Sequence, residues 1–509
     1  MSGTRTWGSD MAPSVRKRSP DRGMPRPFHR LDGMHPVAAA VPRLTALAER
    51  ESVRRVVAAF EAAGHEIALV GGPVRDALLD RRVTDLDLTT SARPDDSAAI
   101  LKPIASAMWD VGRAFGTIAV RVAGDSVEVT TYRQDAYVPS SRKPEVVFGD
   151  TLDGDLRRRD FTVNAIAVRL PSLTIVDPSD GIAAVLERRL TTPSPAVESF
   201  DEDPLRMLRA ARFTAQLGFV LDDEGVRAMT ALAPRIDVVS QERVREELVK
   251  LVSADRPGAG LELLVETGLA DRVLPELPAL RLTRDGEHRH KDVYQHSLQV
   301  LQQAIDLEHE RFPGAAPDVV LRFAALLHDI GKPATRRFEA GGLVTFHHHD
   351  VVGAKLARKR LKELRFPNTE IDRIAKLIEL HQRFFGYGEG AWTDSAVRRY
   401  VRDAGDLLPQ LHILTRADVT TRNERKARRL ATAYDDLERR IEELAEQEEL
   451  DAIRPDLDGE AIMRVLDVKP GPEVGAAYRF LLDLRLEEGP LGEEEATRRL
   501  LEWRAARIS

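Results

Sequence analysis

IALVGGPVRDALLDRRVTDLDLTT, residues 67–90, contains the strongest structural pattern in this chain. Its apolar start ends in Gly71 and Gly72, which is typical of a buried strand that stops at a glycine turn. A helix is expected directly after the turn, where its first backbone N–H groups and the Arg75 guanidinium could bind a phosphate. The stretch therefore predicts a strand, a phosphate-binding turn and a helix in succession.

A second strand is predicted at residues 85–88, where acidic and apolar side chains alternate. The alternation places Asp85 and Asp87 on one face, roughly 7 Å apart along the strand. Carboxylates at this spacing can share one or two divalent cations, and oxygen ligands favour Mg²⁺. Glu128, in the alternating run 126–132, could add a third carboxylate or form a cross-strand salt bridge, and both remain open. A phosphate-binding turn beside metal-binding carboxylates indicates phosphoryl or nucleotidyl transfer, whereas a solvated strand edge would carry no chemistry.

The run DLRRRDFTVNAIAV, residues 155–168, combines an arginine cluster with what we expect to be the first turns of an apolar helix. Arg159 can reach a triphosphate, while Asp160 and Asn164 can hydrogen-bond ribose hydroxyls. A solvated face with a helix cap would use the same residues without binding a nucleotide.

The run EDPLRMLRAARF, residues 202–213, predicts a helix with Pro204 in its first turn. Asp203, Arg206 and Arg209 recur at three-residue steps and fall along one side of that helix. A carboxylate and a planar guanidinium held together can hydrogen-bond the edge of a base. The alternative is a surface ion pair worth a few tenths of a kcal/mol.

These four motifs, in this order, resemble the class II CCA-adding tRNA nucleotidyltransferases and their bacterial poly(A) polymerase relatives. The resemblance implies a polymerase-beta-like head in which Asp85 and Asp87 hold Mg²⁺ and CTP or ATP is bound by Gly72, Arg75 and Arg159. It further implies that Asp203 and Arg206 read the base, with Arg209 nearby, so that protein serves as the template. The candidate catalytic residues are Asp85, Asp87 and Glu128, and the candidate nucleotide-binding residues are Gly72, Arg75, Arg159, Asp160, Asn164, Asp203, Arg206 and Arg209. One departure is Pro178-Ser179-Asp180-Gly181, a turn where the family usually has two adjacent glycines.

A second chemical centre is expected after residue 289, where most of the histidines occur. An adjacent His-Asp pair with further His and Asp residues on separate helices can ligate divalent or transition metals. The set is His296, His328, Asp329, His349, His381 and Asp418. It resembles the HD-domain metal-dependent phosphohydrolases, in which the first three and Asp418 match the four-residue motif and the other two match extra ligands of two-metal members. The resemblance implies hydrolysis of a phosphate ester, while a structural or tRNA-binding domain is the alternative.

Composition restricts the remaining possibilities. The chain has 509 residues, no cysteine and a net charge of −7, so disulfides and thiolate metal sites are excluded and uniform basicity is absent. No apolar run approaches the ~20 residues of a membrane helix, and the basic N-terminus lacks the apolar core of a signal peptide. We therefore expect a cytoplasmic protein without membrane contact, and the sequence does not indicate its oligomeric state.

The predicted architecture is an α+β nucleotidyltransferase head followed by an all-α neck, an HD domain and a helical tail. The expected ranges are a disordered basic extension (1–45), the head (46–195), the neck (196–288), the HD domain (289–420) and a tail that contacts tRNA (421–509). The predicted activity is addition of C, C and A from CTP and ATP to tRNA 3′ ends, with Mg²⁺ as cofactor, pyrophosphate as product and a possible second metal in the HD domain. A poly(A) polymerase, an A-only adding enzyme and an RNA-binding regulatory HD protein with an inactive head are the alternatives.

Overall fold

The chain forms two compact units, and both are seen in a computed structural model. One unit contains residues up to Thr131 together with Val168–Ile175, and the other contains Tyr132–Ala167 and the residues from Val176 onward. The structure describes residues 36–109, 113, 116–136, 145–149, 151–282, 293–339, 344–384, 392–420, 423–448 and 454–508.

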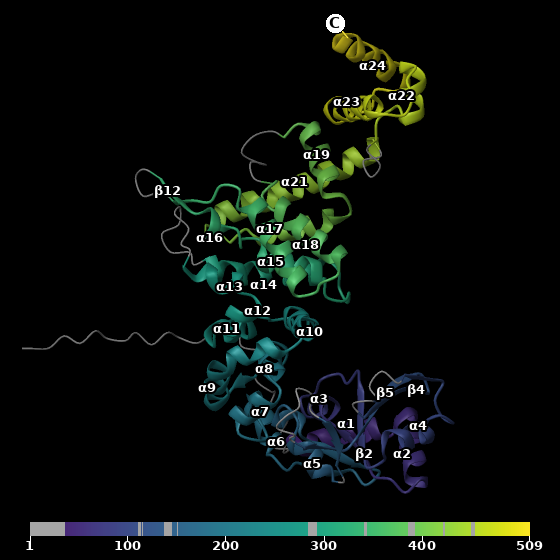
Figure 1. Ribbon diagram of the computed structural model, residues 1–509, viewed down its shortest axis with the longest axis vertical. Helices are drawn as coiled ribbons and strands as arrows, with labels where there is room; N and C mark the ends of the chain where they lie inside the picture. The colour runs from purple at the N-terminus through teal and green to yellow at the C-terminus, as the bar shows by residue number, and fades with distance from the viewer. Residues whose placement is uncertain are drawn as a thin grey trace, which may run out of the picture. The chain divides into compact units, whose positions relative to one another are not determined.

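The first unit is drawn mainly in purple to blue in Figure 1, where β2, β4 and β5 are labelled. It is built on a mixed seven-stranded sheet in the order β3-β4-β5-β2-β1-β8-β9. Its strands are β1 (Ile67–Val70), β2 (Leu86–Thr90), β3 (Ala107–Trp109), β4 (Thr117–Val122), β5 (Asp125–Thr131), β8 (Ala167–Leu170) and β9 (Thr174–Val176). The central pair β2–β5 is parallel, whereas β1–β2, β3–β4 and β4–β5 are antiparallel. A further hairpin is formed by β6 (Arg133–Ala136) and β7 (Glu145–Phe148).

The two faces of this sheet differ in burial. Ile118 and Val120 of β4 and Val127 and Val129 of β5 are fully buried, and the helices α2 (Glu51–Ala62) and α4 (Pro94–Leu101) pack on this side. The residues that alternate with them are half-buried or exposed, as period-2 patterning requires of a sheet covered on one face.

The glycine turn lies where the sequence predicts it. β1 is followed by Gly71 with φ of 71°, a backbone conformation that favours glycine, and then by α3 (Gly72–Leu78). β2 begins at Leu86, so Asp85 immediately precedes the strand.

The predicted disordered extension at the N-terminus reaches too far along the chain. It was expected to reach residue 45, but α1 occupies Pro36–Ala48, with Ala40, Leu44 and Leu47 buried at helical spacing. The Arg43 guanidinium fixes this helix to α3 by donating to the backbone carbonyl of Ala77 at 2.7 Å. Helical burial therefore overrides the proline and basic content that suggested disorder. Residues 1–35 lie outside the described part of the chain.

The second unit is mainly helical. Its N-terminal elements are α5 (Leu152–Arg157), η2 (Thr162–Asn164), α6 (Gly181–Glu187), β10 (Arg189–Leu190), α7 (Ala196–Glu202), α8 (Leu205–Leu217), β11 (Val220–Leu221), α9 (Asp223–Leu232), η3 (Ala233–Val238), α10 (Gln241–Val252), α11 (Gly258–Glu266), α12 (Ala270–Val273), α13 (Glu276–Ala279) and η4 (Leu280–Leu282). Helix α8 packs against both α10 and α11.

The histidine-rich region continues this unit as a helical bundle. Its elements are α14 (Val293–Arg311), α15 (Val319–Leu327), α16 (Lys332–Thr335), β12 (Arg337–Phe338), β13 (Val344–Thr345), α17 (His349–Glu363), α18 (Asn368–Leu380), α19 (Asp394–Ala404), η5 (Gly405–Leu407), α20 (Leu408–Ala417) and α21 (Glu424–Glu448). The tail helices α22 (Gly459–Leu466), α23 (Pro472–Glu488) and α24 (Glu493–Ile508) share a small core of their own. No helix among the described residues is both long and apolar enough to cross a membrane.

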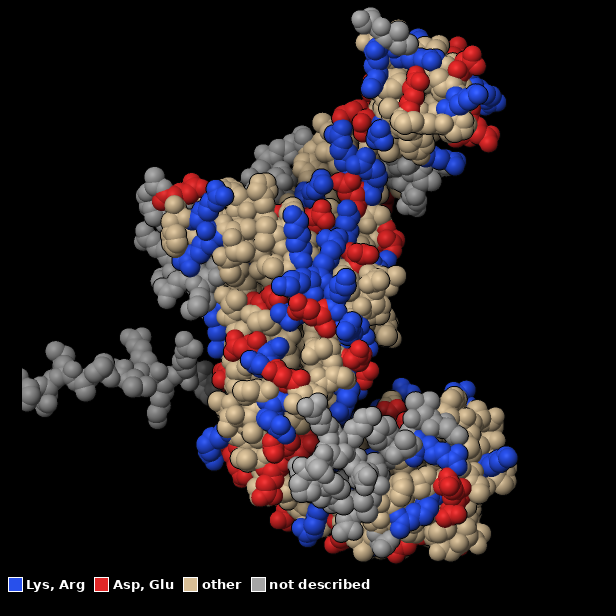
Figure 2. Space-filling model, viewed as in Figure 1, with Lys and Arg blue, Asp and Glu red and all other residues tan. Residues whose placement is uncertain are grey.

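Charge on the visible surface is mixed. Basic and acidic side chains are interspersed over much of the face drawn in Figure 2. Several of the arginines in the helical bundle are ion-paired, as Arg311 and Arg416 are with Glu438 of α21. Helix α21 itself carries both basic and acidic side chains, so it is not a uniformly basic helix.

Candidate functional site

The carboxylate of Asp87 lies on the open face of the head sheet. Asp87 of β2 is in register with Glu128 of the neighbouring parallel strand β5, so both side chains project from the same face. A β-carbon added to Gly72 would lie 3.8 Å from Asp87 Oδ2 and 3.9 Å from Arg75 Nη2. The structure thus brings Asp87 and Glu128 side by side and places Gly72 and Arg75 next to Asp87.

The structure also bears on the alternative that Glu128 forms a cross-strand salt bridge. Glu128 is exposed and forms no ion pair with another described residue, so the cross-strand salt bridge is not present. Asp85 is exposed just before β2. Within the described residues, Asp85, Asp87 and Glu128 do not form a group of three ligand atoms that all lie within 4.8 Å of one another.

In the second unit, a buried acid that the sequence did not single out holds the arginine cluster. Asp155 is buried and accepts hydrogen bonds from Arg158 at 2.7 Å and from Arg159 at 3.0 Å. Burial raises the pKa of Asp155, but the two guanidinium groups outweigh burial and lower it. Asp155 therefore stays ionised and fixes the direction of Arg159.

Asp160 forms the centre of a second network. Its Oδ2 accepts from Arg209 Nε at 2.8 Å and from Arg209 Nη2 at 2.5 Å, while its Oδ1 accepts from Asn164 Nδ2 at 3.1 Å and from the Phe161 N–H at 2.8 Å. Burial raises the pKa of Asp160, but Arg209 and the other donors outweigh it and lower the pKa to about 2. The structure thus brings Asp160, Asn164 and Arg209 together, although they are spread over 50 positions of the chain.

The expected apolar helix at this point is wrong. Residues Thr162–Asn164 form a single 3₁₀ turn, and the apolar residues after it form strand β8 in the head sheet. A short apolar run does not distinguish a buried strand from a helix by periodicity alone. Asn164 therefore reaches Asp160 from a turn rather than along a helix face.

The turn Pro178-Ser179-Asp180-Gly181, which departs from the family pattern, is held by a left-handed residue and by side-chain hydrogen bonds. Asp180 adopts the left-handed conformation with φ of 55°, which aspartate tolerates better than most residues. Asp177 accepts from the N–H groups of Gly181 at 2.7 Å and Ile182 at 2.9 Å. A β-carbon on Gly181 would lie 2.1 Å from the Thr162 carbonyl oxygen, so this second glycine is required for close packing against η2.

Asp203 and Arg206 do not pair with each other. Asp203 accepts from the Leu205 N–H at 3.2 Å and from Arg243 of α10 at 3.4 Å. Arg206 donates to Ser199 Oγ at 2.8 Å and to the Arg158 carbonyl at 2.8 Å. The predicted alternative, a surface ion pair between the two, is therefore absent, and each side chain is held by separate partners.

Helix α10 supplies two residues that sequence reasoning missed. Arg243 contacts Asp203, and the buried Glu247 lies 3.8 Å from Arg209 and 3.2 Å from Arg212. Their four-residue spacing places them on one face of a helix, and this spacing is the sequence feature from which their proximity could have been predicted. The helix lies within the predicted neck (196–288), for which the sequence indicated neither of these roles.

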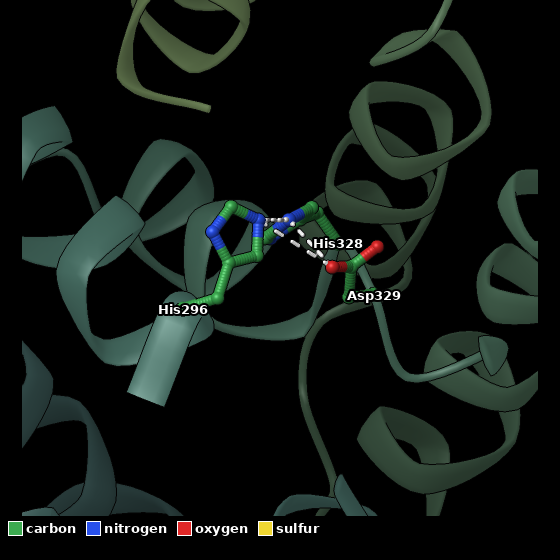
Figure 3. A group of neighbouring side chains, drawn as sticks. All are labelled: His296, His328 and Asp329. Carbon is green, nitrogen blue, oxygen red and sulfur yellow. Dashed lines mark hydrogen bonds and ion pairs between the residues drawn. The ribbon is translucent and has the colours of Figure 1, made fainter. Parts of the chain in front are cut away.

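The histidine-rich region converges on one buried centre. His296 Nε2 lies 3.4 Å from His328 Nε2, and His328 Nε2 lies 3.3 Å from Asp329 Oδ2 (Figure 3). His296 Nε2 also lies 2.9 Å from Asp418 Oδ1. His349 Nε2 lies 3.3 Å from Asp329 Oδ1. His296, His328 and Asp329 form one potential metal-binding group, and Asp329, His349 and His381 form another. All six predicted ligands are therefore placed around one centre or in direct contact with it.

Hydrogen bonds from Nδ1 to the backbone orient three of the imidazole rings. The Nδ1 atoms of His328, His349 and His381 lie 2.8, 2.8 and 2.6 Å from backbone carbonyl oxygens three residues earlier in each case. A carbonyl can only accept, so Nδ1 carries the proton and Nε2 offers its lone pair in the neutral ring, as in metal-binding histidines. His381 Nε2 is buried without a hydrogen-bond partner, which fits a ligand atom of a metal site.

The electrostatics divide the ligands into two kinds. Burial and the neighbouring His328 lower the pKa of His381 to about 4, so that this ring is neutral. Burial also lowers the pKa of His328, but Asp329 and Asp418 outweigh it and raise the pKa to about 10, so a metal that binds to its Nε2 must displace a proton. Lys332 Nζ, 2.8 Å from Asp329 Oδ2, is a neighbour that sequence reasoning missed. The centre offers imidazole nitrogens and carboxylates together, a donor set suited to divalent and transition metals.

Comparisons with known proteins agree with this architecture. Residues 67–191 match the family described as "Poly A polymerase head domain", residues 218–280 match "Probable RNA and SrmB- binding site of polymerase A", and residues 293–423 match "HD domain". The A-adding tRNA nucleotidyltransferase of Deinococcus radiodurans is 36% identical over 82% of this chain and 91% of its own length. The CC-adding tRNA nucleotidyltransferase of Thermus thermophilus is 33% identical over 86% of this chain and 94% of its own.

Among solved structures, the Bacillus stearothermophilus CCA-adding enzyme in complex with CTP is similar with a TM-score of 0.64 and 26% identity, covering 92% of this chain and 98% of that one. A fold with a mixed-sheet head, a helical second unit and an HD centre defines a nucleotide-transferring enzyme of the poly(A) polymerase head class. The chain belongs to the tRNA nucleotidyltransferase family, which confirms the predicted family, fold class and enzyme type.

Proposed function

We propose that this enzyme adds C, C and A in turn to the 3′ ends of tRNA, using CTP and ATP and releasing pyrophosphate. The observation that carries the proposal is the register of Asp87 with Glu128 beside Gly72, which joins the acidic face to the glycine turn. The similarity to CCA-adding enzymes such as that of Geobacillus thermodenitrificans, 44% identical over 208 residues, supports the full three-nucleotide product.

In the head, we propose that Asp85, Asp87 and Glu128 are the catalytic acids and that the first two hold Mg²⁺. Their donor set consists of oxygen atoms alone, which suits this hard cation. Bound there, Mg²⁺ would neutralise phosphate charge and favour ionisation of the attacking 3′-hydroxyl. Gly72 leaves space beside Asp87 for a phosphate, and Arg75 offers a guanidinium on the same turn.

In the second unit, we propose that Arg159 binds the triphosphate and that Asp160 and Asn164 bind the ribose. Asp203 and Arg206 read the base, with Arg209 supporting them. The fixed partners of these side chains support this assignment, because a templating edge must keep its donors and acceptors in place before the nucleotide arrives. Asp155, Arg243 and Glu247 provide that fixation through the contacts described above.

A second candidate function is addition of A alone to tRNA that already ends in CC. The similarity to the A-adding enzyme of Deinococcus radiodurans over most of both chains favours it. Extension of two tRNA transcripts, one lacking CCA and one ending in CC, with CTP and ATP supplied separately and together, distinguishes the products. A stop after C-C-A supports our proposal. Incorporation limited to A on the CC end, limited to CC, or extended into a long A tail would each replace it with another activity.

We also propose that the HD centre binds a divalent or transition metal and hydrolyses a phosphate ester. A metal there would supply a Lewis acid and an activated water. Metal content and hydrolysis of a terminal 2′,3′-cyclic phosphate should both be lost in Asp329→Asn, but not in His347→Ala, whose imidazole is 69% exposed and paired with Glu339 outside the cluster. Equal metal content in the wild type and Asp329→Asn would reject the site. A cytoplasmic location is the setting we propose for both activities.

A further inference from the structure

A straight row of residues crosses the head sheet and ends at an exposed tryptophan. Asp87 of β2 is in register with Glu128 of β5, Glu128 with Ala119 of β4, and Ala119 with Trp109 of β3. Residues in register project from the same face of a sheet. Trp109 therefore lies on the same face as the catalytic acids, three strands away from Asp87.

The core of the unit does not require this tryptophan. Trp109 is 42% exposed, although indole is among the largest apolar groups in proteins, while the opposite face of the sheet supplies the buried core. Ala119, the residue between Glu128 and Trp109, has a small side chain that projects less from the sheet than its two neighbours in the row. An indole kept at the surface in this way is available to stack against a flat ligand.

A cation accompanies the indole. Arg121 of β4, two residues beyond Ala119 and so on the same face, places its Cζ 6.0 Å from the centre of the Trp109 ring. Its side chain is exposed. An aromatic plane beside an arginine is the combination that binds single-stranded nucleic acid, because every base has a stacking face and every nucleotide has a phosphate.

The order of the strands separates two possible occupants. Gly72 and Arg75 follow β1, which lies on one side of β2, whereas β3 lies at the edge on the other side. A nucleotide whose phosphates lie at Gly72 therefore extends away from Trp109 or must cross the acidic row to reach it. The RNA being extended has to be placed differently. Its 3′-hydroxyl must lie at Asp87, while its preceding nucleotides lie elsewhere on the open face of the sheet.

We propose that Trp109 and Arg121 bind the single-stranded 3′ end of the RNA acceptor, with a base stacked on the indole and a phosphate on the guanidinium. This inference rests on the proposed nucleotidyl transfer and assigns it an acceptor-binding surface. Three strand spacings of about 4.8 Å place Trp109 about 14 Å from Asp87 along the sheet. At about 3.4 Å per stacked nucleotide, the contacted base lies within about the last four nucleotides of the acceptor.

The test separates binding from turnover in the full-length protein. The probe is a tRNA minihelix with a 3′-deoxy terminal nucleotide, which binds but cannot be extended, and its Kd is measured for the wild type, Trp109→Ala, Trp109→Phe and Arg121→Ala. Loss of one stacked base weakens binding by about 5-fold to 150-fold, so Trp109→Ala should raise the Kd within that range. Trp109→Phe should recover most of the loss. Val41→Ala, which shortens an exposed apolar side chain on α1, is the matched control and should leave the Kd unchanged.

A kinetic arm uses an extendable minihelix with the same variants. Trp109→Ala should raise the KM for RNA by a factor similar to its effect on the Kd, with the KM for CTP and ATP unchanged. An unchanged Kd for the 3′-deoxy probe in Trp109→Ala overturns the inference even if the wild type extends RNA normally. A rise in the KM for CTP or ATP alone also overturns it, since the indole would then serve the incoming nucleotide. Failure of the wild type to extend any RNA would instead reject the proposed function, and the binding arm would still decide the role of Trp109.

Discussion

Replacement of Asp160 by Asn changes one charge in the network around Arg209 and keeps the shape of the side chain. Asn can still accept from Phe161 through its oxygen, but its NH₂ group would face the Arg209 guanidinium, donor against donor. The pKa of Asp160 falls from 3.8 to about 2 despite burial that raises it, because Arg209, Asn164 and the Phe161 N–H stabilise the anion. At 1.36 kcal/mol per pKa unit this corresponds to about 2.5 kcal/mol of stabilisation. The side chain is only 10% exposed, so solvent screening reduces this value little.

Hydrogen exchange at the Phe161 amide measures this loss locally, which suits a protein too large for a single two-state unfolding energy. A loss of about 2.5 kcal/mol in the local opening free energy predicts exchange roughly 70-fold faster in Asp160→Asn at neutral pH. Asp153→Asn makes the same chemical change on the exposed side of α5 and should leave exchange at Phe161 unaltered. Exchange within about threefold of the wild type in Asp160→Asn would refute the argument that the anion stabilises this turn.

The stabilisation contributed by the Asp160 carboxylate should depend on pH. The folded pKa of Asp160 is lowered, so its contribution is fully present above the unfolded value near 3.8 and is lost as pH falls towards about 2. The difference in stability between the wild type and Asp160→Asn should therefore shrink below about pH 4. A difference that stayed constant over this range would assign the effect to packing rather than to charge.

Three other substitutions test separate parts of the molecule. Gly331→Ala should reduce metal occupancy of the HD centre by at least about tenfold while nucleotide addition continues. The new β-carbon would lie 2.1 Å from the His349 carbonyl oxygen and displace that ligand. Metal analysis and an extension assay on the same sample check this, and unchanged metal occupancy would contradict it. Asp87→Asn should lower nucleotide incorporation by at least about 100-fold with tRNA binding retained, and substantial residual activity would remove Asp87 from the catalytic acids. Glu308→Gln should lower the midpoint of the thermal transition, because it leaves the fully buried Arg322 without its carboxylate partner at 2.7 Å, and breaking a buried ion pair costs about 3–5 kcal/mol locally. A change in the midpoint of less than about 2 °C would show that the Val252 and Ala254 carbonyls, to which Arg322 also donates, are sufficient.

The parts of the site that could be predicted from sequence share a short-range signal. Asp85 and Asp87 occupy alternate positions next to or on one strand, and His328 and Asp329 are adjacent, so local geometry alone brings their side chains near one another. The glycine turn was recognisable for the same reason, since Gly71 adopts a conformation that few other residues tolerate. The placement of candidate site residues could be predicted where chemistry and spacing coincide within a few residues.

The parts that could not be predicted depend on tertiary contacts. Asp155 looked like one acid in a charged run, and only the fold shows that it is buried beneath two arginines. The sequence also favoured a helix after Asp160, because the apolar run gave no periodicity to distinguish a strand. The helix at residues 36–48 was hidden by the prolines at both its start and its middle.

The residues missed by sequence reasoning have a common physical role. Asp155 and Glu247 are buried acids that contact arginines, which lie three and four residues further along the chain for Asp155 and on α8 for Glu247. Lys332 is the cation that serves the same purpose for Asp329. A guanidinium on a flexible side chain recognises a ligand well only when its orientation is fixed beforehand, and a buried carboxylate fixes it through charge and two-point hydrogen bonding. Removing an acid that holds an arginine of the proposed base-recognition set should therefore change which nucleotide is selected before it abolishes transfer, because the proposed catalytic acids of the head sheet remain unaltered. Glu247→Gln, which weakens the contact to Arg209, should accordingly raise misincorporation between CTP and ATP more than it lowers total incorporation, and an equal loss for both nucleotides would show that Glu247 serves the fold alone.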